Sequence, residues 1–190
     1  VDDRDLHRGP LLPGSRQARR KGASVQIAVI YHSETGNTRR MAELVQQGCE
    51  RVPGVVARCM PVDAVDQDYV DGAAGLILGA PVYGGSCSWQ MKRFLDTGSR
   101  RTWAGKLGGV FVSQRYPAGG GESFGEMVII AGMLSRGMMV YSGGVLGRPD
   151  GLHFGAVSVG APEGIYGERC LRLGEAIATR AMELGLARQG

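Results

Sequence analysis

Cysteine is scarce in this sequence, and no two cysteines lie close together. The 190 residues contain only Cys49, Cys59, Cys87 and Cys170. A Cys-x-x-Cys pair is the usual spacing of zinc sites and dithiol redox sites, so we expect no metal site. Chains of this length seldom depend on a disulfide framework. We therefore expect free thiols and a cytoplasmic protein.

Long apolar runs are also missing. A membrane-spanning helix needs about 20 consecutive, mostly apolar residues. The apolar run at residues 23–31 is shorter than that and is soon followed by Ser33 and Glu34. The sequence therefore predicts a soluble protein without a membrane span. An apolar fraction of 43% argues against a largely disordered chain.

The excess of positive charge is confined to the N-terminal residues. Residues 1–24 hold six Lys and Arg against three Asp, a balance of +3, which leaves 16 minus 15, or +1, for residues 25–190. Binding to a nucleic-acid backbone requires a basic patch or stripe on the folded domain. We therefore expect no nucleic-acid partner.

The N-terminal segment has no apolar periodicity. It contains Pro10, Pro13 and the basic run at residues 16–21. A twin-arginine export signal would need an apolar region with a cleavage site after Arg19-Arg20, and a strand pattern follows instead. We interpret residues 1–24 as a flexible N-terminal extension or a cloning remnant, and residues 25–190 as one domain.

Glycine is abundant, with 32 residues, and short apolar runs alternate with helical patterns. Period-2 or wholly apolar runs predict strands at Val25–His32, Val55–Val62, Gly75–Ala80, Lys106–Ser113, Met138–Tyr141 and Ala156–Val159. Helical spacing predicts helices through Met41–Val52, over Gln90–Asp96, after a capping box at Ser123-x-x-Glu126, and over Glu163–Leu186. In the third of these, Met127, Val128, Ala131 and Leu134 share one face. The alternation predicts a doubly wound α/β sandwich.

The loop after the first strand has the composition of an anion-binding site. It reads Ser33-Glu34-Thr35-Gly36-Asn37-Thr38. Its hydroxyls, its glycine and the free N–H groups of a helix start form a cradle for negative charge without a lysine. The loop matches neither the P-loop nor the dinucleotide fingerprint, which leaves a phosphate monoester as the expected ligand. A hydroxyl-rich N-cap turn is the alternative.

This loop resembles the phosphate loop of the flavodoxin superfamily, [ST]-x-T-G-x-T, whose ligand is flavin mononucleotide (FMN). The resemblance implies a flavodoxin-like fold, with a five-stranded parallel sheet in the order 2-1-3-4-5 and helices on both faces. It covers residues 25–187 and is weakest at residues 143–162. It implies an FMN-binding domain over residues 25–190.

The loop after the third strand resembles the quinone-reductase branch of that superfamily. It begins Pro81-Val82-Tyr83-Gly84-Gly85, and the resemblance implies that it lies along the flavin ring. Tyr83 can present an aromatic face, and the two glycines allow backbone amides to approach the ring. An ordinary surface position is the alternative for Tyr83. We expect Trp89 to serve packing or a contact with a partner subunit.

The loop after the fourth strand carries the rest of the resemblance. It contains Ser113, Gln114, Arg115, Tyr116, Gly119, Gly120 and Gly121. With the preceding Trp103-Ala104-Gly105-Lys106 it is similar to NAD(P)H:quinone oxidoreductases like the tryptophan-repressor-binding flavoprotein. A mobile surface loop is the alternative.

The resemblance implies an FMN-dependent oxidoreductase that passes a hydride from NADH or NADPH to a quinone by a ping-pong scheme. It also implies a homo-dimer or homo-tetramer. No catalytic side chain is certain; His153 and Tyr83 are candidates. The alternative is a flavodoxin-type electron carrier that docks on a partner redox protein. We expect Lys92, Arg93, Arg100 and Arg101 to gather near the ring loop, which favours an anionic dinucleotide donor and hence the enzyme.

Overall fold

The computed structural model describes residues 24–117, 119–145 and 151–186. The predicted N-terminal extension lies outside these residues except for Ser24, as do residues 146–150 of the weakly matching segment. The strands are β1 (Val25–Tyr31), β2 (Val55–Pro61), β3 (Gly75–Tyr83), β4 (Ser86–Cys87), β5 (Leu107–Gln114), β6 (Met139–Val140) and β7 (Ala156–Val159). The helices are α1 (Asn37–Glu50), α2 (Gln67–Gly72), α3 (Trp89–Thr97), α4 (Arg100–Trp103), α5 (Glu122–Leu134) and α6 (Ile165–Glu183).

The sheet confirms the predicted order. Its path is β2-β1-β3-β5-β6, and every pairing along it is parallel. The fifth position is divided: β6 pairs with the start of β5 at Leu107–Gly108, and β7 pairs with its end at Phe111–Gln114. The carboxyl ends of β1, β3 and β5 therefore meet at one edge of the sheet, where ligands bind in such folds.

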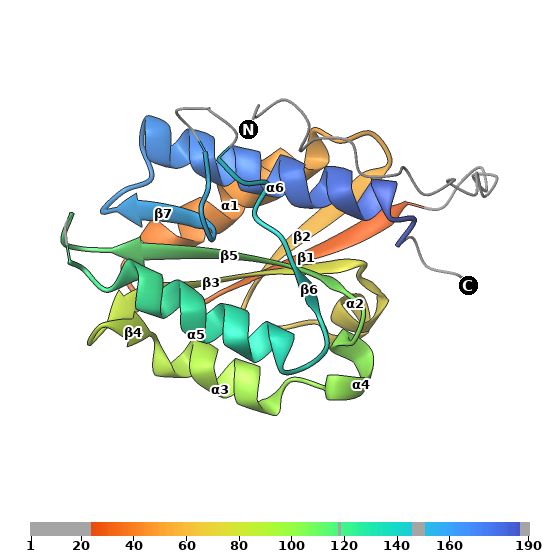
Figure 1. The fold of residues 1–190 in the computed structure, drawn as a ribbon, viewed down its shortest axis with the longest axis horizontal. Helices are drawn as coiled ribbons and strands as arrows, with labels where there is room; N and C mark the ends of the chain where they lie inside the picture. The colour runs from red at the N-terminus through yellow and green to blue at the C-terminus, as the bar shows by residue number, and fades with distance from the viewer. Residues whose placement is uncertain (1–23, 118, 146–150, 187–190) are drawn as a thin grey trace, which may run out of the picture.

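Helices cover both faces of the sheet, as expected for strands that are apolar on both sides (Figure 1). Helices α1 and α6 pack together on one face, with a core that includes Met41, Val45, Phe111 and Ile177. Helices α3 and α5 lie side by side on the other face. None of the helices in the described part of the chain is long and apolar enough to cross a membrane.

Contact between α1 and α6 depends on two helical glycines. A Cβ atom at Gly48 would overlap the carbonyl oxygen of Leu171, and one at Gly174 would overlap that of Val45. Both obstacles are backbone atoms, which cannot rotate away as a side chain can. The two helices therefore pack backbone to backbone, and α1, which begins at the predicted phosphate loop, is fixed in position by α6.

We expect Gly174→Ala to lower the free energy of unfolding by about 1–3 kcal/mol, because the added methyl group forces α1 and α6 apart. Gly132→Ala in α5 is the matched control, since its Cβ would come 2.8 Å from the flexible end of Leu95. The control should lose less than half as much. Urea unfolding of both variants measures the difference, and equal losses would contradict the account.

Candidate functional site

The first loop presents a helix start without a side-chain cap. Gly36 is the N-cap residue of α1, with φ 95°, and no side chain within the described residues caps the helix. The N–H of Gly36 donates to Ser33 Oγ at 3.2 Å, and the first turn contains no acidic residue. Thr35 and Gly36 are exposed, and a Cβ at Gly36 would meet nothing within 4 Å. The helix dipole and N–H groups of α1 thus face open space.

The second loop is a hairpin, which differs from the prediction. Pro81, Val82 and Tyr83 do not belong to a loop, because β3 continues to Tyr83 and pairs antiparallel with β4. Only Gly84 and Gly85 form the turn, with φ values of 57° and 76°. Two positive φ angles are typical of the tight hairpin turn that best matches strand twist. The turn exposes both glycines to open space.

The third loop begins at the buried end of β5 and closes against the hairpin. Ser113 and Gln114 are buried, and Arg115 and Tyr116 are exposed. A Cβ at Gly121 would come 2.7 Å from the Cα of Gly85. Only glycine permits this approach. The second and third loops are therefore in direct backbone contact.

Two hydrogen bonds join the loops further. The buried Thr38 hydroxyl lies 2.7 Å from the hydroxyl of Ser113, which connects the first loop to the third. The Tyr83 hydroxyl donates to Glu34 Oε2 at 3.2 Å, which connects the second loop to the first. Burial, and then Glu34, raises the pKa of Tyr83, so this side chain stays a neutral hydrogen-bond donor at physiological pH. The predicted loops form one site.

The residues of this site fit a flavin phosphate ester chemically. The uncapped start of α1 and the hydroxyls of Ser33 and Thr35 supply donors for a phosphate monoester. Gln114 has a buried Oε1 that accepts no hydrogen bond from any residue the structure describes, which suits an N–H on the edge of a ring. The open glycine turn of the hairpin leaves room for a flat ligand.

The start of α5 contradicts the predicted capping box. The helix begins at Glu122 with Gly121 as N-cap, so Ser123 lies inside the helix and caps nothing. Glu126 turns inward and is only 3% exposed. Burial, and then Glu122, raises the pKa of Glu126 to about 7. The burial of Glu126 could have been found from the helical period. Glu126 shares one face of α5 with four other residues, and this is the face that the helix buries: Gly125, Ile129, Ile130 and Met133.

Glu126 lines a cavity that also receives His153. This cavity of ≈ 280 Å³ lies between the start of α5, the segment before β7, and α6, with Phe154 and Arg169 in its wall. Among the described residues, Glu126 Oε1 and Glu122 Oε2 are buried there and have no hydrogen-bond partner. The structure therefore groups His153 with two carboxylates rather than with the first loop.

Other predicted residues lie away from the site. Arg100 and Arg101 are in α4, which precedes the start of β5, so they lie at the opposite edge of the sheet from the ring loop (Figure 1). Lys92 forms an ion pair with Asp96 at 2.6 Å. The prediction that Arg100 and Arg101 lie near the second loop, along the flavin ring, is therefore wrong.

The Trp103–Lys106 segment, which supported the branch resemblance, is structural. Trp103 is buried against the ring of Phe94, with the centroids 5.4 Å apart. The Lys106 ammonium donates to the backbone carbonyls of Asp71 and Ala73. These contacts hold α2, α4 and β5 together and do not reach the three loops.

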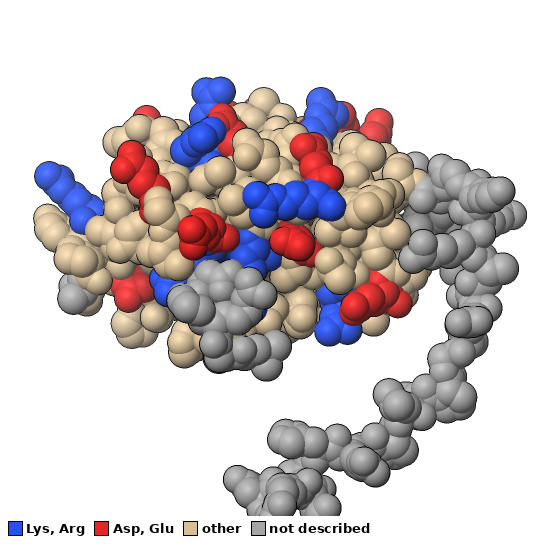
Figure 2. Space-filling model, turned by 90° about the horizontal axis from the view of Figure 1, so that it is seen from above, with Lys and Arg blue, Asp and Glu red and all other residues tan. Residues whose placement is uncertain are grey.

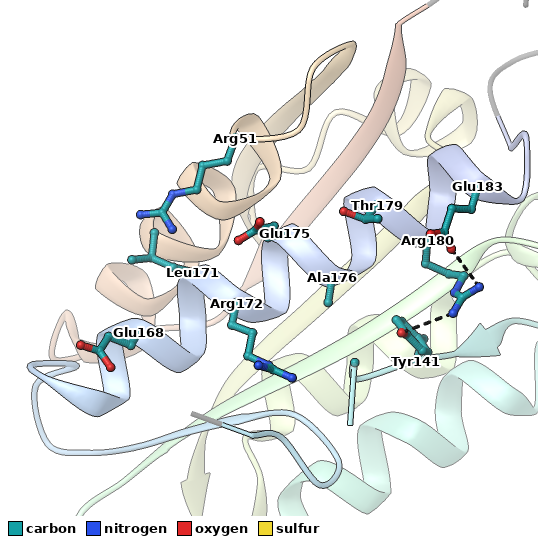
Figure 3. Close-up of a pocket in the computed structure, with 11 residues that line it drawn as sticks. Arg51, Tyr141, Glu168, Leu171, Arg172, Glu175, Ala176, Thr179, Arg180 and Glu183 are labelled. Carbon is teal, nitrogen blue, oxygen red and sulfur yellow. Dashed lines mark hydrogen bonds and ion pairs between the residues drawn. The ribbon is translucent and has the colours of Figure 1, made fainter. Parts of the chain in front are cut away.

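A groove of ≈ 730 Å³ runs along α6 and is separate from the site (Figure 3). Arg51, Arg172 and Arg180 line it together with Glu168, Glu175 and Glu183, and Arg180 pairs with Glu183 at 2.9 Å. None of the predicted cofactor-binding residues lines this groove. The positive and negative side chains of the groove are equal in number, so the groove has no net positive charge to attract a phosphate.

Comparison with known proteins agrees with the fold. Residues 29–115 match the family model described as Flavodoxin. The chain is 34% identical over 161 residues to "Flavodoxin" of Clostridium saccharobutylicum, covering 84% of this chain and 99% of the relative. It is 29% identical to "NAD(P)H dehydrogenase (quinone)" of Archaeoglobus fulgidus, covering 84% and 98%. The solved "flavodoxin, WrbA-like protein from Agrobacterium tumefaciens" has a TM-score of 0.68 at 25% identity, covering 84% and 99%.

Glu126 should make stability depend on pH. Its pKa is raised to about 7 in the folded protein, whereas an unfolded Glu titrates near 4.3, so the folded state holds a proton that the unfolded state releases. Stability therefore falls as the pH rises from about 4 to 7 and levels off above that range. We expect Glu126→Gln to be more stable than the parent by about 2–3 kcal/mol at pH 8, with the gain vanishing near pH 4.

Urea unfolding across this pH range measures the effect. Glu163→Gln, at an exposed position, is the control and should show no such gain. A gain that is the same at pH 4 and pH 8 would contradict the assignment of the proton to Glu126.

Proposed function

The chain belongs to the flavodoxin family, and we propose that it is an FMN-dependent oxidoreductase that passes electrons from NADH or NADPH to a quinone-like acceptor. Family membership implies FMN as the cofactor. The observation that carries the proposal is the junction of three loops at one sheet edge, joined by the Thr38–Ser113, Tyr83–Glu34 and Gly85–Gly121 contacts.

The start of α1 would hold the phosphate. The N–H groups of the first turn and the hydroxyls of Ser33 and Thr35 donate to phosphate oxygens, and the helix dipole supplies positive potential. Thr38 orients this turn through its buried bond to Ser113. No acidic side chain in the first turn of α1 opposes the negative charge.

The hairpin and the third loop would hold the ring. When bound there, FMN would supply the redox chemistry, as a carrier of two electrons between a reduced nicotinamide and the acceptor. The backbone N–H groups of the glycine turns would stabilise negative charge on the ring, and the buried Gln114 Oε1 would be available to accept from a ring N–H. Tyr83 would flank the ring on the side of the hairpin, with its hydroxyl in the neutral form.

The acceptor would use the cavity beside the third loop. Phe154 gives that cavity an apolar ring surface, and Arg169 gives it a cation for a quinone oxygen. Because the pKa of Glu126 is about 7, this carboxyl can hold a proton at neutral pH and release it from its unpartnered Oε1. Reduction of a quinone to a hydroquinone consumes protons, and His153 and Glu126 are the groups placed to supply them.

A second candidate function is a flavodoxin-type electron carrier. The relative named Flavodoxin is more similar to this chain, at 34% identity, than the relative named NAD(P)H dehydrogenase (quinone), at 29%. The placement of Arg100 and Arg101 at the far edge also removes part of the charge argument for a dinucleotide donor. The net charge of +1 over residues 25–190 argues against a carrier, because carriers that dock on basic partners tend to be acidic.

Steady-state kinetics separates the two functions. We expect the FMN-loaded protein to oxidise NADH or NADPH rapidly when a soluble benzoquinone is present, at a turnover of order 1 s⁻¹ or more. Glu126→Gln should keep its flavin and lose activity as the acceptor step slows. Turnover close to the rate of free FMN would reject the enzyme and favour the carrier.

The phosphate site is tested by Thr35→Glu. The added carboxylate opposes the phosphate charge at an exposed position, so we expect FMN affinity to fall by roughly 100-fold or more, with little change in unfolding free energy. Thr179→Glu, also exposed but on α6, is the matched control and should bind FMN normally. Flavin fluorescence titration gives both affinities. Normal binding by Thr35→Glu would show that the first loop does not hold the phosphate.

A further inference from the structure

The cavity beside the third loop has buried, unpartnered polar atoms of opposite charge. Glu122 and Glu126 line it from the start of α5, and Arg169 lines it from α6. The atoms Glu122 Oε2, Glu126 Oε1 and Arg169 Nε are buried, and none has a hydrogen-bond partner among the described residues. Glu126 is only 3% exposed, so bulk water does not solvate its carboxyl group. Buried polar groups without partners are rare in folded proteins and are typical of functional sites.

The charged groups of this cavity differ from those of the helix surfaces. Figure 2, which looks onto the side of α1 and α6, shows cationic and anionic side chains interspersed over that side. Ion pairs form on these helices, such as Arg39 with Glu43 at 3.1 Å and Arg180 with Glu183 at 2.9 Å. No ion pair within the described residues joins Arg169 to a carboxylate of the cavity. A space that a ligand can fill therefore separates the guanidinium from the two carboxyl groups.

The unpartnered atoms define the chemistry of the ligand that would satisfy them. Carboxylate oxygens accept hydrogen bonds, whereas a guanidinium only donates them. A ligand that satisfies both must carry N–H or O–H donors next to an acceptor. A quinone offers acceptors alone, so it leaves the carboxylate of Glu122 without a partner. A primary carboxamide offers both, because its oxygen accepts from Arg169 and its two N–H bonds donate to the carboxylates.

The size and the opening of the cavity suit a flat ring that carries such an amide. Pockets for drug-sized ligands span roughly 300–1,000 Å³. This cavity of ≈ 280 Å³ is smaller, so it admits one ring-sized group and not a whole dinucleotide. His153 and Phe154 line the cavity and are exposed, which places them at its opening. Their flat rings can pack against the flat ring of a ligand.

The cavity adjoins the loops that would hold the flavin ring. Glu122 directly follows Gly121, the residue that approaches Gly85 of the hairpin. A group bound against Glu122 is therefore one residue away from the junction of the second and third loops. This is the neighbourhood in which an electron donor has to bind.

We propose that this cavity recognises the nicotinamide carboxamide of the electron donor, with Arg169 binding the amide oxygen and Glu122 and Glu126 binding the amide nitrogen. The inference rests on the proposed function for the identity of its ligand, and it extends that function by assigning residues to the donor. Donor and acceptor would occupy the cavity in turn, as a ping-pong scheme requires. With a pKa of about 7, Glu126 is present at neutral pH both as an acceptor for the amide and as a proton donor for the quinone.

Binding of two small pyridines to the FMN-loaded protein tests the proposal without turnover. Nicotinamide and 3-acetylpyridine share their ring and their carbonyl group, but only nicotinamide has N–H donors. We expect nicotinamide to bind at least about 10-fold more tightly, because 3-acetylpyridine cannot donate to the carboxylates. Isothermal titration calorimetry or ligand-observed NMR gives both dissociation constants. Equal affinities would overturn the proposal.

Two variants separate the roles of the carboxylates and the guanidinium. Glu126→Met removes an acceptor, so the preference for nicotinamide should fall at least about threefold. Arg169→Met removes the donor that both pyridines use, so both should bind several-fold more weakly while the preference remains. Glu168→Met, at an exposed position outside the cavity, is the matched control and should bind like the parent. An unchanged preference in a folded, flavin-loaded Glu126→Met protein would contradict the assignment.

Turnover distinguishes failure of this inference from failure of the proposed function. With a soluble benzoquinone, NADH should have a higher kcat/KM than its 3-acetylpyridine analogue, and the ratio should be smaller in Glu126→Met than in Glu168→Met. Rapid oxidation of NADH by a protein that binds both pyridines equally would overturn the inference and leave the proposed function intact. Preferential binding of nicotinamide without oxidation of NADH would support a carboxamide site and reject the oxidoreductase.

Discussion

The contact between Gly85 and Gly121 is the constraint on which the arrangement of the site depends. A side chain at Gly121 would overlap the hairpin backbone and separate the second loop from the third. The two hydrogen bonds, Thr38 to Ser113 and Tyr83 to Glu34, then attach the first loop to the other two. The three loops are thereby held in one geometry by the chain itself, which lowers the entropic cost of binding a ligand there.

The two helical layers of the sandwich serve different purposes. On one side, α1 and α6 pack backbone to backbone at Gly48 and Gly174 and present charged residues outward. On the other side, α3 and α5 leave Trp89, Phe124, Met127 and Leu134 exposed. Close packing on the first side fixes the helix that begins at the predicted phosphate loop. A single sheet thus separates a closely packed layer with a charged surface from a layer with an apolar surface.

A shared motif need not carry chemistry. The Trp103–Lys106 segment matches the quinone-reductase pattern, yet Trp103 packs on Phe94 and Lys106 binds backbone carbonyls of the chain. Glu126 was predicted only as part of a capping box, yet it is buried with a raised pKa and lines a cavity beside the third loop. Evidence for the reaction therefore comes from the environment of a residue more than from the pattern in which it occurs.

The sequence by itself determined the parallel strands and the main helices, because apolar periodicity is local. The order of the sheet followed from the resemblance of the loop motifs to a known family. The sequence also located the three loops, since each directly follows a strand. Only the tertiary structure decided that Pro81–Tyr83 extend β3, that Gly121 caps α5, and which side of α5 is buried. Helix α5 is apolar on two faces, so its period could not distinguish the face against the sheet. Gly125 and Gly132 lie close to the side chains of Val82 and Leu95, so the face that carries them packs against the neighbouring elements.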